Sequence, residues 1–327
     1  MRRYMTRRLL QLIPLFFIVT LMTFGLMQMA PGGPEDIFLA GEDPNVRPED
    51  IAALRKQWGL DDPIHVQYFK WLGNLLQGDL GRSFSTQRPV MEAIAGRWLP
   101  SLQLSLTITI LTYLLSIPIG IIVAVRRYSM LDYVVSVFSF LGYAMPNFWV
   151  GAMLIIYVAL PSGGLIPTSG FSSPNITVES AGLLAVILDR AKYMLLPVLT
   201  GVTGGMAGLV AYTRRSMLDV LKEDYVRTAR AKGLAEKVVI YKHTLRNALL
   251  PIVTISSGLL GVFFAGNVVL EYVFGYPGIG ALSIKAVNSK DYPMVMAFLL
   301  IGFFVGNLSS LLTDFVYVIV DPRIKYS

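Results

Sequence analysis

Long apolar runs alternate with shorter polar stretches along this chain of 327 residues. The longer runs are about long enough to cross ~30 Å of hydrocarbon as helices that rise ~1.5 Å per residue. They are continuous rather than alternating in polarity, so they predict helices and not barrel strands. The pattern predicts six membrane spans, at about 9–29, 101–125, 133–160, 194–212, 251–272 and 294–320.

Composition supports a membrane location, because 54% of the residues are hydrophobic and only 15% are charged. An ordinary soluble domain is more polar than this. We therefore expect an all-α polytopic membrane protein in three parts. These are residues 1–30, with a cytoplasmic N-terminus and the first helix, an extracytoplasmic region at 31–100, and a five-helix core at 101–327. The core carries a polar cytoplasmic loop at about 213–250.

Basic residues gather before the first predicted span, after the second and fourth spans, and at the C-terminus. Acidic residues are frequent in 31–100, on the opposite side of the predicted membrane. The positive-inside rule therefore predicts a multi-pass protein with both termini in the cytoplasm. This distribution also accounts for the net charge of +7, so we do not expect nucleic acid as a partner.

The connectors outside the membrane are expected to be mostly helical. In 31–100 we predict short helices at about 48–54, 63–76 and 88–98, with Val66, Phe69, Leu72 and Leu76 on the apolar face of the second. About 70 residues is near the lower limit for an independent core, so this region should pack on the outer ends of the spans. In the second outside connector, residues 181–187 predict an interfacial helix.

The polar loop contains a short segment with the signals of a surface helix. Glu223 and Asp224 stand where such a helix would begin, Arg230 and Lys232 where it would end, and Gly233 follows. This order suits the helix dipole and the left-handed backbone of a glycine C-cap. The segment therefore predicts a stable surface helix that contacts a partner.

Polar groups inside the predicted spans are candidates for a translocation path. Asn307, Ser310 and Asp314 are three and seven residues apart, so they share one helix face. A charged group in the bilayer normally faces protein or water. Asp314 is equally compatible with a place at the cytoplasmic interface. Asn147 follows Pro146, which should kink the third span, and this kink either lines a path or only packs.

Other conspicuous residues have structural explanations. In the fourth span Gly201, Gly204, Gly205 and Gly208 predict close helix packing. Glu271, near an outer end of a span, is expected to be solvated, as is Lys285. The glycine cluster at 275–280 lacks the lysine of a phosphate loop and predicts a turn.

Motifs of catalysis are absent from the sequence. There is no G-x-x-x-x-G-K-[ST] loop, nucleophile elbow or H-E-x-x-H motif. The chain has no cysteine, and its two histidines are predicted on opposite sides of the membrane, so we expect no metal site. An enzyme is thus disfavoured. Paired, interrupted spans are not evident either, which disfavours a secondary transporter built from inverted repeats.

Several motifs resemble one known family. Residues 225–234, followed by His243 to Pro251, are similar to the cytoplasmic loop of binding-protein-dependent ABC permeases. The segments 271–280, 291–293 and 321–326 agree with the B-type subunit of the dipeptide, oligopeptide and nickel branch. Arg227 and Thr228 depart from the wider E-A-A-x-x-x-G pattern, and Arg246 stands at its proline position. These departures are familiar in the peptide branch.

The resemblance implies a fold like that of type I ABC importer permeases, and a non-catalytic half-transporter in a prokaryotic plasma (inner) membrane. Its partners would be membrane lipid, a homologous C-type permease, an extracytoplasmic substrate-binding protein and two ATPase subunits. The ATPases would bind ATP and Mg, and this chain would bind no cofactor. The resemblance places ATPase coupling on Asp224, Tyr225, Arg227, Ala229, Arg230, Lys232, Gly233 and Leu234.

The substrate expected from the resemblance is a dipeptide or oligopeptide. The same machinery imports nickel, glutathione or oligosaccharides in some members of the branch, so these stay open. A protein of a different class, such as a stand-alone secondary transporter or channel, is the alternative.

Overall fold

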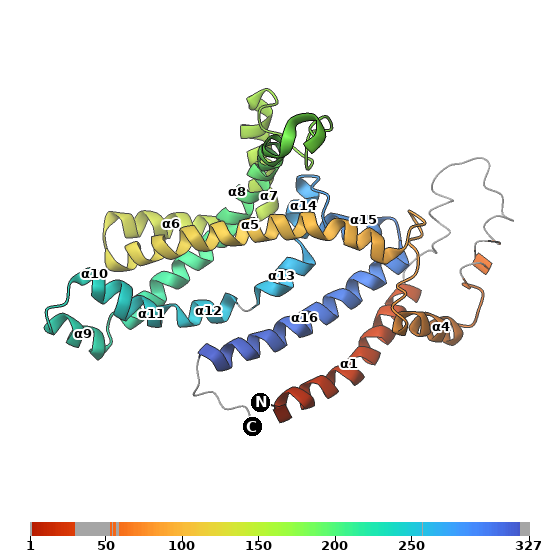
Figure 1. Cartoon of the computed structure of the whole chain (residues 1–327), viewed down its shortest axis with the longest axis horizontal. Coiled ribbons are helices and arrows are strands. Elements are labelled where there is room, and N and C mark those ends of the chain that lie inside the picture. The colour runs from red at the N-terminus through yellow and green to blue at the C-terminus, as the bar shows by residue number, and fades with distance from the viewer. Residues whose placement is uncertain (1, 30–52, 54, 57–58, 257, 321–327) are drawn as a thin grey trace. The chain divides into compact units, whose positions relative to one another are not determined.

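A computed structural model describes residues 2–29, 53, 55–56, 59–256 and 258–320 of the chain (Figure 1). In these residues the regular elements are helices, apart from one isolated bridge that pairs Arg82 with Pro89. The predicted all-α class is therefore confirmed. The helix predicted at about 48–54 falls mainly outside the described residues.

Five helical segments are long and apolar enough to cross a membrane, and a bent pair of helices makes a sixth. Four of the segments lie in single helices, α1 (Arg2–Gln28), α5 (Val90–Val125), α8 (Val178–Val220) and α16 (Tyr292–Val320). The fifth runs through α12 (Leu250–Ser256), α13 (Leu259–Ala265) and α14 (Val268–Val273). Each predicted span thus has a counterpart in the structure.

The third span is broken rather than gently kinked. It consists of α6 (Met130–Ala144) and α7 (Asn147–Leu154), which continues as a π-helical turn, η1 (Ile155–Ala159), and a 3₁₀ turn, η2 (Leu160–Ser162). The two parts are bent by 101° at Pro146. Proline has no N–H to donate to the preceding turn, which explains why the helix ends there.

The span that contains α12, α13 and α14 is interrupted as well. Gly266 takes the backbone angles φ 69° and ψ 179° between α13 and α14, a conformation open mainly to glycine. The structure thus has two interrupted spans, although no paired, interrupted spans are evident in the sequence. Their apparent absence therefore no longer disfavours a secondary transporter.

Two predicted connector helices are parts of longer helices. The segment 88–98 is not a separate helix, because α5 runs without a break from Val90 through Pro100 into the span. The interfacial helix expected at 181–187 belongs to α8, which begins at Val178 with a capping box formed by Thr177 and Ser180. Only Gly182, with φ 81°, departs from helical angles inside α8.

The chain divides into two compact units, which are described separately. In the first, made of residues 1–98 and 282–308, α4 (Ile64–Leu76) packs against α1. Tyr68 shares a hydrogen bond of 3.1 Å with Thr20, and its ring lies edge-on to Phe24. The contact with a span is as predicted, and Leu72 of the predicted apolar face is buried. Phe69 and Leu76 of that face are exposed, and Tyr68 and Trp71 contact α1 instead.

A buried carboxylate joins two segments of the same unit. Asp291 directly precedes α16 and is 1% exposed. It accepts hydrogen bonds from the Ser83 hydroxyl at 2.5 Å, from the Phe84 N–H at 3.0 Å, and from both the N–H and the hydroxyl of Ser85. The Asp-Tyr-Pro motif therefore fixes the loop at 83–85 to the start of α16.

The second unit comprises residues 99–281 and 309–323, and in it α5 packs closely on α8. A Cβ atom at Gly201 would lie 2.6 Å from Ile108 Cδ1, and one at Gly205 would lie 3.0 Å from Thr112 Cγ2. Gly204 is equally tight, against Asn147, whereas a Cβ at Gly208 would meet nothing within 4 Å. The packing prediction is thus confirmed for three of the four glycines.

Candidate functional site

The polar loop at about 213–250 is helical almost throughout. After α8 ends at Val220, the chain forms α9 (Asp224–Ala231), α10 (Glu236–Val238), the π-helical η3 (Val239–Thr244) and α11 (Leu245–Ala248). Figure 1 shows these elements together at the end of α8. The surface helix predicted from the sequence is confirmed as α9.

A glycine ends α9 in the predicted way. Gly233 has φ 73°, in the left-handed region. Its N–H bonds to the Arg230 carbonyl at 2.9 Å, and the N–H of Leu234 bonds to the Ala229 carbonyl at 3.4 Å. This pair of bonds is the Schellman motif, which satisfies carbonyls that the helix itself leaves free. The end of α9 is therefore fixed by the backbone.

Two small apolar residues hold α9 on the rest of the loop. Val226 is 0% exposed and Ala229 is 5% exposed, and both pack against the buried Val239 of η3. They are three residues apart and so share one face of the helix. Ala229 is consequently an inward-facing packing residue, and a partner would not contact its side chain.

The other predicted coupling residues lie on the surface. The exposed set is Asp224, Tyr225, Arg227, Arg230, Lys232, Gly233 and Leu234. Tyr225 is nonetheless fixed in position, since its hydroxyl accepts a hydrogen bond of 2.7 Å from the Asn247 amide. Arg227 forms an ion pair of 3.3 Å with Asp224. The structure thus presents a polar, mostly basic face.

An ion pair ties the end of α9 to the start of α10. Arg230 donates to both carboxylate oxygens of Glu236, and the shortest of these contacts is 2.7 Å. The hydrogen bond from Arg230 lowers the pKa of Glu236, and the same contact raises the pKa of Arg230. Both side chains are about half exposed, so solvent weakens the pair.

The residues predicted for a translocation path lie on two different helices. Asn147 is the first residue of α7, and its side-chain oxygen would be only 2.3 Å from a Cβ placed at Gly204 of α8. Asn307, Ser310 and Asp314 all lie on α16, where Asn307 donates to the Phe303 carbonyl at 2.8 Å. A pathway role stays a prediction for all four.

The structure contradicts the expectation that Glu271 is solvated. This side chain is 0% exposed. One carboxylate oxygen accepts from the Ser101 hydroxyl at 2.7 Å and from the Asn267 N–H at 3.0 Å, and the other accepts from the Ala281 N–H at 3.1 Å. Burial is tolerated because these donors replace water. Lys285, in contrast, is exposed as expected.

Glycines make room for this carboxylate. A Cβ at Gly278 would lie 2.3 Å from the Glu271 carboxyl carbon, and one at Gly280 would lie 2.4 Å from the Val268 Cα. The predicted turn at 275–280 is therefore part of the core rather than an open loop. Tyr276 in this turn is fully buried, and burial raises the pKa of its hydroxyl to about 12.

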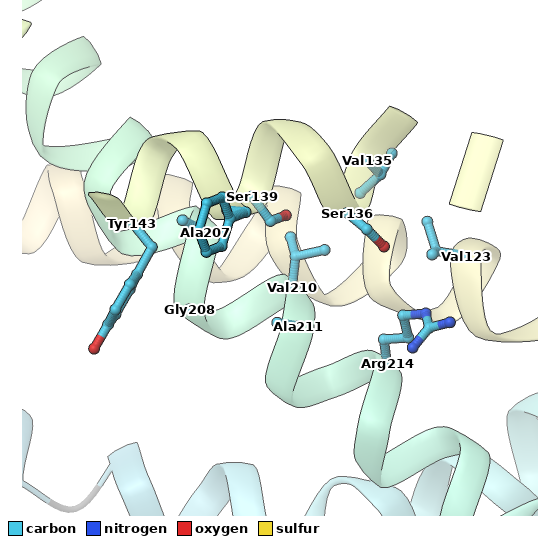
Figure 2. Close-up of a pocket in the computed structure, with 11 residues that line it drawn as sticks. Val123, Val135, Ser136, Ser139, Tyr143, Ala207, Gly208, Val210, Ala211 and Arg214 are labelled. Carbon is cyan, nitrogen blue, oxygen red and sulfur yellow. The ribbon is translucent and has the colours of Figure 1, made fainter. Parts of the chain in front are cut away.

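Another buried charge that the sequence did not predict lies on α6. Asp132 of α6 is 3% exposed and receives Arg214 of α8 in two parallel hydrogen bonds, of 2.7 and 2.8 Å. Arg214 also lines a cavity of about 410 Å³ between α6 and α8, which Figure 2 shows in close-up. In the sequence Arg214 counts only as one of many basic residues after a span. Its partner, 82 positions away, is visible only in the fold.

The protein is helical and has several spans, a polar helix (α9) that follows α8, and a cavity between α6 and α8. This is the design of a membrane transport component. Comparison with known families makes this specific. Residues 116–326 match the binding-protein-dependent transport system inner membrane component, and residues 1–107 match the N-terminal part of such membrane components. The chain belongs to this family, so it is a membrane subunit of an ABC transport system and not its ATPase.

Relatives match over the whole chain. It is 42% identical over 327 residues to the oligopeptide transport system permease protein AppB of Bacillus subtilis (strain 168), with all of both chains covered. It is 37% identical over 340 residues to the dipeptide transport system permease protein DppB of Escherichia coli (strain K12), which covers 100% of this chain and 99% of DppB. The glutathione transport system permease protein GsiC of Salmonella choleraesuis (strain SC-B67) is also 37% identical, over 326 residues and the full length of both chains.

Proposed function

We propose that this chain is the permease subunit of an ATP-driven importer for dipeptides or oligopeptides, and that it forms half of the translocation path. The proposal is supported by full-length similarity to permeases named for oligopeptide and dipeptide transport. The relative named for glutathione transport fits the same chemistry, because glutathione is itself a modified tripeptide. A homologous C-type permease would supply the other half of the path.

The observation that carries the coupling role is the construction of α9. A subunit without an ATP site has to receive force through a contact with an ATPase. A capped helix transmits a displacement better than a flexible loop does. Val226 and Ala229 fix α9 on η3, and the polar side chains of α9 face outward. In this proposal two ATPases bind ATP and Mg and hold α9 in a surface groove, while an extracytoplasmic binding protein delivers the peptide.

The proposed orientation places α9, the N-terminus and the C-terminus in the cytoplasm of a prokaryotic cell. It rests on the basic residues beside the ends of the spans. The chain has no cysteine, so single cysteines report sidedness directly. A cysteine in the Asn74→Cys variant, on the exposed part of α4, should react with an impermeant reagent from outside, and one in Lys237→Cys should not. The opposite pattern would reject the orientation.

The coupling role is tested in the assembled complex reconstituted in proteoliposomes. Gly233→Pro forces φ to about −65° where the backbone needs 73°. We expect this variant to insert normally but to lose co-purification with the ATPases and ATP-driven peptide uptake. Arg230→Glu should reduce both, because it repels Glu236 and reverses the charge of the outward face.

Gly163→Pro is the matched control, since Gly163 also has a positive φ, of 64°, but lies outside the polar loop. This variant should retain the ATPases. Normal uptake by the Gly233→Pro complex would overturn the coupling role. Peptide transport by the chain alone, without ATPases, would indicate a stand-alone transporter instead.

A further inference from the structure

The polar side chains of α6 form one stripe on an otherwise apolar helix. Asp132, Ser136, Ser139 and Tyr143 follow at intervals of four, three and four residues, which places them on one face. Apart from Tyr133 and Gly142, the other residues of α6 are apolar. Hydroxyl and carboxylate groups on a membrane helix normally face protein or water rather than lipid. The stripe therefore marks the side of α6 that meets a polar partner.

This stripe faces the cavity between α6 and α8. Ser136, Ser139 and Tyr143 line it from α6 together with Val135 and Phe140. Mostly small residues line it from α8, so that a ligand could come close to the α8 backbone. Figure 2 shows Arg214 at one end of the cavity and Tyr143 at the other. The volume, about 410 Å³, is within the range of sites for small ligands. The α8 residues of the lining are Ala207, Gly208, Val210, Ala211 and Arg214.

The guanidinium of Arg214 is held in a fixed orientation. Asp132 accepts from its Nε and Nη2 atoms, and is itself held by the Tyr128 N–H at 2.9 Å. In the described part of the chain the third nitrogen, Nη1, forms no hydrogen bond, although Arg214 lines the cavity. Arg126 and Arg127, which follow the last turn of α5, are exposed and add positive charge to this end of the second unit. The end of the cavity at Arg214 thus favours an anionic group.

We propose that this cavity is a peptide-binding site within the translocation path, an inference that rests on the proposed function. Arg214 binds the terminal carboxylate of the peptide, and the hydroxyls of Ser136, Ser139 and Tyr143 bind its backbone amide groups. An importer of many peptides has to recognise what all peptides share, namely the backbone and the termini. A lipid acyl chain fits less well, because it offers no polar partner to the hydroxyls of Ser139 and Tyr143. Asp132 acts as a positioning residue for Arg214.

The experiment uses the complete complex, with its second permease, ATPases and binding protein, in proteoliposomes. Ser139→Cys places the only cysteine of this chain in the cavity, and its rate of reaction with a small methanethiosulfonate reagent is measured with and without dialanine. We expect dialanine to slow the reaction several-fold. Val137→Cys is the matched control, because Val137 lies on the same helix, is 57% exposed and does not line the cavity. Its reaction rate should not change.

The role of the carboxylate is tested with dialanine amide. Loss of a charge-assisted hydrogen bond should raise the concentration needed for equal protection about tenfold. Arg214→Gln should abolish this difference between acid and amide. If Arg214→Gln fails to assemble, dialanine and dialanine amide can still be compared on the Ser139→Cys complex. Equal protection by the two compounds would show that the cavity does not bind the terminal carboxylate.

Uptake of dialanine by the unaltered complex is measured in parallel. If uptake is normal but dialanine leaves position 139 unprotected, this inference is wrong and the proposed function stands. The phosphatidylglycerol content of the proteoliposomes is also varied. If the cysteine at position 139 is protected by this lipid and not by dialanine, the cavity is a lipid site and the peptide-site inference is wrong. A cysteine that reacts only in the isolated subunit would show that a neighbouring subunit fills the cavity. Absence of ATP-driven peptide uptake would refute the proposed function and the site together.

Discussion

Two polar regions of this molecule contrast in where their charges lie. In α9 the charged side chains face outward, and the helix is held by the small apolar residues Val226 and Ala229. Around Glu271 the carboxylate is fully buried and is held by the Ser101 hydroxyl, the Ala281 N–H and the N–H of Asn267 at the start of its own helix. The first arrangement suits a contact with a partner, whereas the second fixes the ends of helices within the chain.

The contrast teaches that the location of a charge decides how costly its loss is. An exposed charge keeps its water when its partner is removed, so the loss is small. When the hydrogen bonds of a buried carboxylate are lost, neither the carboxylate nor its former donors can form replacement hydrogen bonds with water. We therefore expect substitutions around Glu271 to affect stability most, and substitutions on α9 to affect coupling more than stability.

Glu271→Ala should be the most damaging substitution. It leaves the Ser101 hydroxyl and the N–H groups of Asn267 and Ala281 without their acceptor, and each buried group left unsatisfied costs about 1–3 kcal/mol. The purified chain in detergent should melt at a clearly lower temperature, followed by tryptophan fluorescence. Lys285→Ala serves as control and should melt like the unaltered protein. Equal melting temperatures for both variants would show that the carboxylate is not structural.

Gly278→Ala should come next, through steric overlap alone. The added methyl group would lie 2.3 Å from the Glu271 carboxyl carbon and from the Ser101 hydroxyl oxygen. Overpacking of this kind typically costs about 1–3 kcal/mol. Gly302→Ala is the control, because a Cβ there meets nothing within 4 Å. The same thermal measurement should separate the two, and a tolerated Gly278→Ala would mean that the turn at 275–280 can move aside.

The same contrast explains how far the sequence alone predicts this structure. Helical spans and α9 follow from local signals, namely apolar runs, caps and charge order, and the structure confirms them. The break at Pro146 has a local signal, but its angle of 101° depends on the packing of α7 against α8. The contacts of Tyr68 and Trp71 with α1 were missed, because these side chains are amphipathic and their burial depends on which residues lie beside them.

The buried polar groups could not be predicted, because their partners are far away in the chain. Ser101 and Glu271 are separated by 170 positions, and Ser83 and Asp291 by 208. The sequence does not show which donors will surround a carboxylate near the end of a span. Solvation is therefore the natural prediction for such a group. The one usable signal was the pair Gly278 and Gly280, whose lack of side chains leaves room for a close neighbour.

Gly233→Ala should have a moderate and local effect. An L-residue in the left-handed region costs about 1–2 kcal/mol, so the last turn of α9 should fray. Because Val226 and Ala229 still hold the helix, the melting temperature of the chain should change little. Hydrogen exchange should become faster at the N–H groups of Gly233 and Leu234, which close the cap. Uniformly faster exchange over the whole chain would instead mean that α9 contributes to global stability.

The smallest effect is expected from the ion pair between Arg230 and Glu236. The pKa of Glu236 is lowered in the folded chain from its ordinary value of 4.5, so the pair stabilises the loop above that ordinary pKa and loses this contribution as the pH falls through the lowered pKa. With both partners about half exposed, the contribution should be about 1 kcal/mol or less. Glu236→Gln should therefore barely change stability at neutral pH and should remove the local change in hydrogen exchange between neutral and acidic pH. If Arg230→Glu combined with Glu236→Arg restores the pair but not ATPase binding, then Arg230 acts through its contact with the partner rather than through the stability of α9.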